Sequence, residues 1–188
     1  KYLSENPIEG IENESYLPSA LQQVEQNMGD YLETHPEATG MASTLTLLLI
    51  SDEGDKALIG WVGDSRVYHI RDGEILFQTK DHSVVQGMVD MGEITEEEAQ
   101  THPKRNIITR AINGTNPTRI DQEIITDIKK NDFFFLCTDG ILETLTKNEV
   151  LAWFKAQTSA EEVKSKILAN AKDVTKDNYS MYIIKIAE

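Results

Sequence analysis

Two aspartates in the C-terminal half of the sequence stand where a strand meets a loop, a position that suits metal chemistry. Asp139 follows the apolar run from Phe133 to Cys137, and Asp177 comes just before a strand-like segment that begins at Tyr179. Carboxylates held at strand ends can converge on a hard cation such as Mg²⁺ or Mn²⁺, because these ions prefer oxygen ligands. An Asp-Gly pair after a strand is also an ordinary turn, as is an Asp-Asn pair, so both interpretations stay open at this point.

The cysteine and the histidines add few candidates for catalysis. Cys137 is the single cysteine, which excludes an internal disulfide, and its place in an apolar run predicts a buried thiol rather than a nucleophile. Among the four histidines, we expect His35 and His69 to be structural or exposed. His82 and His102 are the two that we consider as candidates near a site, because histidine titrates near neutral pH.

Hydrophobic periodicity predicts the elements that must position these groups. Apolar residues at helical spacing predict a helix over residues 17–32, and capping-box spacings predict further helix starts at Thr95 with Glu98, Thr146 with Glu149, and Ser159 with Glu162. These spacings place a short turn of helix after residue 95 and longer helices at 147–156 and 160–172, while 83–91 reads as one more. Runs of β-branched and apolar residues predict strands at 43–50, 57–62, 66–70, 75–79, 121–126, 133–137 and 179–186.

The connections between these strands indicate the fold class. Asp72-Gly73 predicts a tight hairpin turn, because glycine accepts the positive φ that such turns require. We therefore expect the middle of the chain to be an antiparallel meander, followed by a helical insertion. Hairpin connections rather than helical crossovers favour an α+β fold, in which a sandwich of two antiparallel sheets is flanked by helices.

Composition limits the classes of partner. The chain has 188 residues, 39% of them hydrophobic and 27% charged, which suits one domain, so residues 1–188 are predicted to form a single domain. Eighteen basic residues against 32 acidic ones give a net charge of −14, which opposes binding to nucleic acid or to anionic lipid. The sequence has neither a long uncharged apolar run nor a signal-like start, so we expect no membrane association and a cytoplasmic location.

Six short segments, taken in order, resemble the later motifs of the type 2C family of metal-dependent Ser/Thr protein phosphatases. The bacterial branch is the most similar, because residues 84–99 resemble its flap segment. The segments are Gly40-Met41-Ala42-Ser43-Thr44-Leu45, Trp61-Val62-Gly63-Asp64-Ser65-Arg66-Val67-Tyr68, Thr79-Lys80-Asp81-His82-Ser83, His102-Pro103-Lys104-Arg105-Asn106-Ile107-Ile108-Thr109-Arg110-Ala111, Cys137-Thr138-Asp139-Gly140-Ile141 and Lys176-Asp177-Asn178.

The resemblance implies a fold and a metal centre. The family fold is an α-β-β-α sandwich, in agreement with the class predicted from the strands. By resemblance, Asp139 and Asp177 are ligands of a two-metal centre for Mn²⁺ or Mg²⁺, and Asp81 helps to hold a third, weaker metal. Asp64 would organise its turn, as a structural residue near the site together with Gly140 and Asn178.

The opening motifs of the family do not occur in these 188 residues. They comprise an arginine that meets phosphate, an Asn-Glu-Asp segment and a glycine-rich acidic loop. The segment Ile11-Glu12-Asn13-Glu14-Ser15-Tyr16-Leu17 has a chance likeness to the second of these, because no glycine-rich acidic loop follows it. We therefore expect a catalytic domain that lacks its N-terminal part, and a fragment that by itself could be inactive.

Two functions follow as hypotheses. The first is hydrolysis of phosphoserine and phosphothreonine in proteins by a metal-activated water, opposing a Ser/Thr kinase. The second is a catalytically inactive, phosphatase-like scaffold that binds a protein or phosphoprotein partner. Retention of Asp81, Asp139 and Asp177 favours the enzyme, because carboxylates that converge without a metal repel one another and cost stability.

Overall fold

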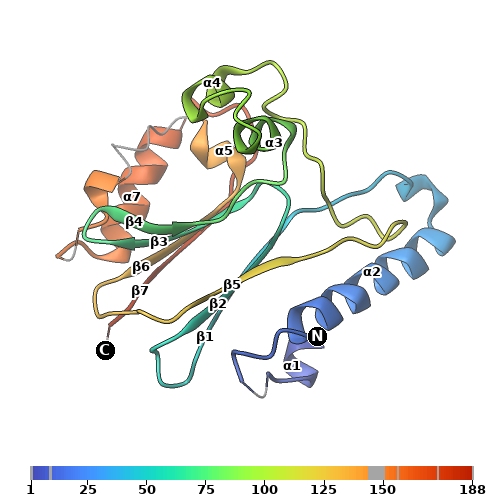
Figure 1. The fold of residues 1–188 in the computed structure, drawn as a ribbon, viewed down its shortest axis with the longest axis horizontal. Coiled ribbons are helices and arrows are strands. Elements are labelled where there is room, and N and C mark those ends of the chain that lie inside the picture. The colour runs from blue at the N-terminus through green and yellow to red at the C-terminus, as the bar shows by residue number, and fades with distance from the viewer. Residues whose placement is uncertain (1, 9, 144–150, 156, 173, 188) are drawn as a thin grey trace.

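Two antiparallel β-sheets packed face to face form the centre of the protein, and helices cover their outer faces (Figure 1). The computed structural model describes residues 2–8, 10–143, 151–155, 157–172 and 174–187. The two packed antiparallel sheets with helices outside them confirm the predicted α+β sandwich. Within these ranges, no helix is both long and apolar enough to cross a lipid bilayer.

The strands divide between a three-stranded and a four-stranded sheet. The first has the order β1-β2-β5, with β1 at Leu45–Ile50, β2 at Ala57–Val62 and β5 at Asp121–Ile125. The second has the order β4-β3-β6-β7, with β3 at Arg66–Arg71, β4 at Glu74–Gln78, β6 at Phe133–Cys137 and β7 at Met181–Lys185. All the predicted strands are present, with ends that differ by up to two residues.

The predicted antiparallel meander in the middle of the chain is wrong at one point, because β2 and β3 do not pair with each other. Strand β2 pairs with β1 and β5, whereas β3 pairs with β4 and β6, so the chain changes sheets between Val62 and Arg66. Gly63 makes this crossing possible with a φ of +101°, and a Cβ there would lie 2.3 Å from Cγ2 of Thr44. The predicted hairpin at Asp72-Gly73 is confirmed, because both residues have positive φ.

The helices agree with most of the capping signals. They are α1 at Tyr2–Glu5, α2 at Tyr16–Thr34, α3 at Val84–Asp90, α4 at Glu96–Thr101, α5 at Asp139–Leu142 and α7 at Ala160–Ala171, with a 3₁₀ turn at Pro36–Ala38. The capping boxes at Thr95 and Ser159 are both formed. The one predicted at Thr146 lies outside the described residues, and of the predicted helix at 147–156 residues 151–153 are described as helical.

Three apolar layers hold the sandwich together. Helix α2 packs Leu17 and Leu21 against Leu58 of the first sheet, and α7 packs Val163 and Ile167 against the second. Between the sheets lies a middle layer of Ala57, Ile59, Trp61, Val67, Phe134 and Leu136. Strand β6 is fully buried because alternate side chains point into two of these layers, which explains its unbroken apolar sequence.

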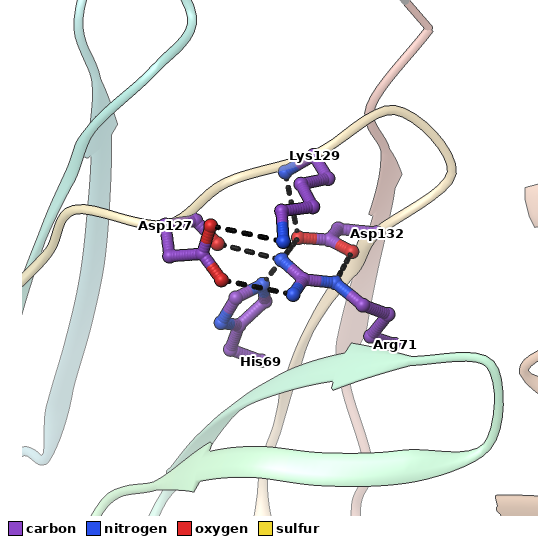
Figure 2. Close-up of polar contacts among 5 residues, drawn as sticks. All are labelled: His69, Arg71, Asp127, Lys129 and Asp132. Atoms are coloured by element: carbon purple, nitrogen blue, oxygen red, sulfur yellow. Dashed lines mark hydrogen bonds and ion pairs between the residues drawn. The ribbon is translucent and has the colours of Figure 1, made fainter.

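A network of charged groups lies at the end of the second sheet where β3 ends and β6 begins (Figure 2). The carboxylate of Asp132, which is 0% exposed, lies 2.7 Å from Nε2 of His69 and accepts hydrogen bonds from Nε and Nη2 of Arg71 at 2.7 and 2.9 Å. Arg71 also donates to the exposed carboxylate of Asp127. The network ties the connection between β5 and β6 to strand β3.

Candidate metal site

The opposite ends of the same strands bring Asp139 and Asp177 together. Asp139 begins α5 directly after β6, and Asp177 lies in the loop before β7. Two hydrogen bonds join the two segments, one from the N–H of Thr138 to the carbonyl of Ser180 and one from the N–H of Ser180 to the side-chain Oγ1 of Thr138. Because β6 and β7 are neighbours in register, the two aspartates emerge at the same edge of the sheet.

Gly140 allows this close approach. A Cβ at this position would lie 2.5 Å from the carbonyl oxygen of Asn178 and 3.4 Å from Cβ of Asp177. A side chain would therefore push the loop of Asp177 away from Asp139. The predicted role of Gly140 and Asn178 as structural residues near the site stays a prediction that this geometry supports.

The negative charges of Asp139, Asp177 and Asp64, called the acidic edge below, repel one another at this end of the strands. Partial desolvation and the neighbouring charge of Asp177 raise the pKa of Asp139 above its ordinary value. Burial and the charges of Asp139 and Asp81 raise the pKa of Asp64 in the same way. A group of carboxylates whose pKa values rise together carries uncompensated negative charge, and a bound cation relieves it.

Asp64 and Asp81 occupy different electrostatic surroundings. The side chain of Asp81 receives two parallel hydrogen bonds of 2.7 Å, from Nε and Nη2 of Arg66, so its charge is already balanced. Arg66 also donates to the hydroxyl of Tyr68. Asp64 has no such cation among its hydrogen bonds in the described ranges, although Arg66 contributes at longer range. The raised pKa of Asp64 and its lack of a hydrogen-bonded cation in the described ranges thus group Asp64, rather than Asp81, with the uncompensated carboxylates.

Glu143 and Arg105 are two further residues at this edge that were not among the predicted site residues, although Arg105 lies in one of the segments that resemble the family. The carboxylate of Glu143 accepts hydrogen bonds from the N–H of Lys176 and the hydroxyl of Thr175, which fixes the loop that carries Asp177. These bonds, with the charge of Arg105, lower the pKa of Glu143. Arg105 therefore lies near the acidic edge although it is distant in sequence. The contacts of Glu143 have no local signal in the sequence, because its partners lie 32 and 33 positions away.

The two candidate histidines differ in position. His82 is buried, and its ring contacts Gly63, Asp121 and Arg110. Its ring contacts the Gly63–Asp64 turn and therefore lies near the acidic edge without a hydrogen bond to its carboxylates. His102 ends α4, and its Nδ1 accepts the N–H of Lys104, a local contact within its own turn.

The sequence model of the Protein phosphatase 2C family matches residues 1–172. The chain belongs to the Protein phosphatase 2C family. This membership confirms the resemblance found in the motifs, and the arrangement of the sheets agrees with it. Since the match begins at the first residue of the chain, the helices before β1 are included in the family relationship.

Several phosphatases resemble this family member. The Ser/Thr protein phosphatase PstP of Mycobacterium tuberculosis (strain CDC 1551 / Oshkosh) is 33% identical over 159 residues, which are 84% of this chain and 30% of PstP. The crystal structure of Stp1 from Staphylococcus aureus has a TM-score of 0.86 at 31% identity, and the match covers 98% of this chain and 72% of Stp1. The catalytic domain of PstP in complex with two manganese ions has a TM-score of 0.82 at 26% identity, covering 98% and 75% respectively.

The acidic edge of this Protein phosphatase 2C chain suits a hard divalent cation but supplies only part of a coordination shell. Among the residues that the structure describes, no three His, Cys, Asp or Glu side chains are already arranged as a metal cage. Asp139 and Asp177 nevertheless offer exposed carboxylate oxygens side by side, which is the donor chemistry that Mg²⁺ and Mn²⁺ require. Since Mg²⁺ prefers about six oxygen ligands, others must come from water, substrate or further residues.

Proposed function

We propose that the protein is a phosphoprotein phosphatase, which hydrolyses phosphoserine and phosphothreonine with the help of Mn²⁺ or Mg²⁺. The observation that carries the proposal is the convergence of Asp139 and Asp177 at one sheet edge in a member of the Protein phosphatase 2C family. The chain spans less than a third of the mycobacterial PstP that it matches, so its activity and partners are inferred and not carried over.

Asp139 and Asp177 are the residues that we assign as ligands of a two-metal centre. Divalent cations in such a centre lower the pKa of water and offset the charge of phosphoryl oxygens. Asp64 adds a third uncompensated carboxylate, and Asp81, predicted as a ligand of a weaker third metal, would have to share its oxygens with Arg66. Gly140 and Glu143 hold the two ligand-bearing segments together.

A cysteine nucleophile does not fit this site. The thiol of Cys137 is buried between the sheet and its helices, and this desolvation raises its pKa to about 12. A thiol with such a pKa is protonated at neutral pH and is a poor nucleophile. The proposed chemistry therefore uses water, and Cys137→Ser should leave the metal dependence of turnover intact.

The expected substrates are phosphorylated proteins, and a Ser/Thr kinase would supply them. The net charge of −14 argues against nucleic acid as a partner, and a cytoplasmic location remains part of the proposal. An inactive scaffold is the alternative function, but no feature of the described residues favours it. The charge of Asp177 raises the pKa of Asp139, and such repulsion between carboxylates costs stability that a scaffold has no reason to sacrifice.

Metal-dependent hydrolysis tests the proposal directly. We would measure hydrolysis of p-nitrophenyl phosphate and of a phosphothreonine peptide by the full-length protein at increasing Mn²⁺, and compare Asp139→Asn with Asp127→Asn. Both substitutions remove one exposed carboxylate charge, but Asp127 contacts Arg71 at the end of β3 that lies beside the start of β6, whereas Asp139 follows the end of β6 (Figure 2). The proposal expects Mn²⁺-dependent turnover that Asp139→Asn abolishes and Asp127→Asn preserves. Equal turnover in both variants, or none in folded wild-type protein, would reject it.

A further inference from the structure

His82 forms hydrogen bonds with both the main-chain N–H and the main-chain carbonyl of Gly63, the residue where the chain crosses from one sheet to the other. Its Nδ1 accepts the main-chain N–H of Gly63 at 3.0 Å, and its own main-chain N–H donates to the carbonyl of Gly63 at 2.9 Å. The positive φ of Gly63 directs the chain into Asp64 and Ser65. A side chain and a main chain from one residue thus clamp the turn that carries Asp64.

The surroundings of the ring select the tautomer that this clamp needs. Nδ1 can accept a hydrogen bond only when it carries no proton, so the proton of the neutral ring must be on Nε2. The carboxylate of Asp121 lies 3.1 Å from Nε2 and accepts that proton's hydrogen bond. Nη1 of Arg110 donates to the other oxygen of Asp121 at 2.8 Å and also lies 3.0 Å from Nε2 of His82. Because arginine can only donate, a hydrogen bond from Arg110 to Nε2 would move the ring proton to Nδ1 and leave the N–H of Gly63 without its acceptor, so we assign the Nη1 proton to Asp121.

Packing and main-chain contacts fix the ring from its remaining sides. The indole of Trp61 stacks on the imidazole with an interplanar angle of 13°, and its own N–H donates to the carbonyl of Lys80. The carbonyl of His82 accepts the N–H of Thr109 at 2.7 Å. His82 therefore joins the Gly63 turn to the segment that follows α4, and its side chain is 8% exposed.

We propose that His82 is a positioning residue for the acidic edge: its unprotonated Nδ1 sets the Gly63–Asp64 turn and so the placement of Asp64 beside Asp139. This inference rests on the proposed phosphatase function for its kinetic consequence. It does not make His82 a catalytic residue, since the hydrogen bonds of its ring go to the Gly63 turn and to Asp121 and not to Asp64, Asp139 or Asp177. An error of about 1 Å in the placement of such a group can cost about 100-fold in rate.

Two nearly isosteric variants separate the roles of the two ring nitrogens. Asn at position 82 keeps an acceptor close to the place of Nδ1, whereas Gln keeps a donor close to the place of Nε2. For the full-length protein we expect His82→Asn to retain kcat to within about 10-fold and His82→Gln to lose about 100-fold, with little change in KM. The matched substitutions His35→Asn and His35→Gln, at the end of α2, should change neither constant.

A nuclear magnetic resonance measurement gives a second readout that does not depend on activity. In ¹⁵N-labelled wild-type protein, we expect an unprotonated Nδ1 and a scalar coupling across the hydrogen bond between the amide nitrogen of Gly63 and Nδ1 of His82. A protonated Nδ1, or His82→Gln as active as His82→Asn, would overturn the positioning role. Wild-type protein without metal-dependent turnover would reject the phosphatase proposal instead, and the ¹⁵N measurement would then decide on the clamp alone.

Discussion

Acidic side chains lie at both ends of strands β3 and β6, and the aspartates on either side of β6 differ in whether their charges are paired with cationic side chains. At one end, Asp132 is buried against His69 and Arg71, and at the other, Asp139 stands beside Asp177 with no cation bound to it by a hydrogen bond in the described ranges. Burial opposes ionisation of Asp132, but hydrogen bonds from Arg71, Lys129 and His69 outweigh it and lower its pKa. The pKa of Asp139 is raised.

The difference shows how one pair of strands can separate stability from chemistry. At the paired end, hydrogen bonds to both oxygens of the buried Asp132 carboxylate hold the connection between β5 and β6 (Figure 2). Charges that are unpaired and accessible weaken the fold slightly and leave their oxygens free for a cation. We therefore expect substitutions at the two ends to affect different measurements.

Asp132→Asn should have the largest effect on stability. The substitution removes the charge of a fully buried carboxylate and leaves the guanidinium of Arg71 with one charged partner fewer. Because the side chain of Arg71 is 27% exposed, we expect the free energy of unfolding to fall by about 3 kcal/mol, the lower end of the range for a broken buried ion pair. Urea unfolding of the metal-free protein measures this quantity. A loss below about 1 kcal/mol would show that the network is dispensable, while Asp139→Asn, the matched change at the other end, should cost almost nothing.

Mn²⁺ should stabilise the wild-type protein through the acidic edge. Binding to the folded state alone adds about 2.7 kcal/mol at a free concentration of 100 times Kd. We expect this gain, measured as a rise in the thermal midpoint, to disappear in Asp139→Asn and to persist in Asp127→Asn. A full Mn²⁺-induced rise in Asp139→Asn would place the metal elsewhere.

The two ends should also differ in their response to acid. Because the pKa of Asp132 is lowered on folding, its contribution is complete above the unfolded value of about 3.9 and is lost as the pH falls through the folded value. The effect of Asp139 on stability changes with pH in the opposite direction. Because its pKa is raised on folding, its contribution to the free energy of unfolding is present at low pH and is lost as the pH rises through the folded value. Urea midpoints between about pH 5 and pH 3 should therefore fall less steeply in Asp132→Asn than in the wild type. An unchanged slope would contradict this assignment.

Local patterns in the sequence predicted the elements well, because each pattern reports the surroundings of neighbouring residues. The run Phe133 to Cys137 predicted a buried strand, and the capping boxes at Thr95 and Ser159 predicted helix starts. The change of sheet at Gly63 was missed because a glycine in a short loop is compatible with either a hairpin or a crossing. That distinction depends on which strands pair.

The sites were predictable only where the family motifs carried the information. The resemblance singled out Asp139 and Asp177, but it did not predict the pairing of Asp81 with Arg66 or the grouping of Asp64 with Asp139. These contacts depend on side chains that approach through the tertiary fold. The pair of His69 with Asp132, 63 residues apart, likewise has no local signal, and His69 read as merely structural or exposed.

The smallest effect on stability should come from the exposed ion pair of Lys129 with Asp127, which forms the rim of the network around Asp132. The ammonium of Lys129 lies 3.3 Å from the carboxylate of Asp127, and both side chains are more than 60% exposed. Exposed ion pairs contribute about 0–1 kcal/mol because water and salt screen them. Lys129→Gln should thus leave the urea midpoint nearly unchanged, since the buried carboxylate of Asp132 takes the main-chain N–H of Lys129 and not its side chain. A loss as large as that of Asp132→Asn would mean that the rim, and not the buried pair, stabilises this end of the sandwich.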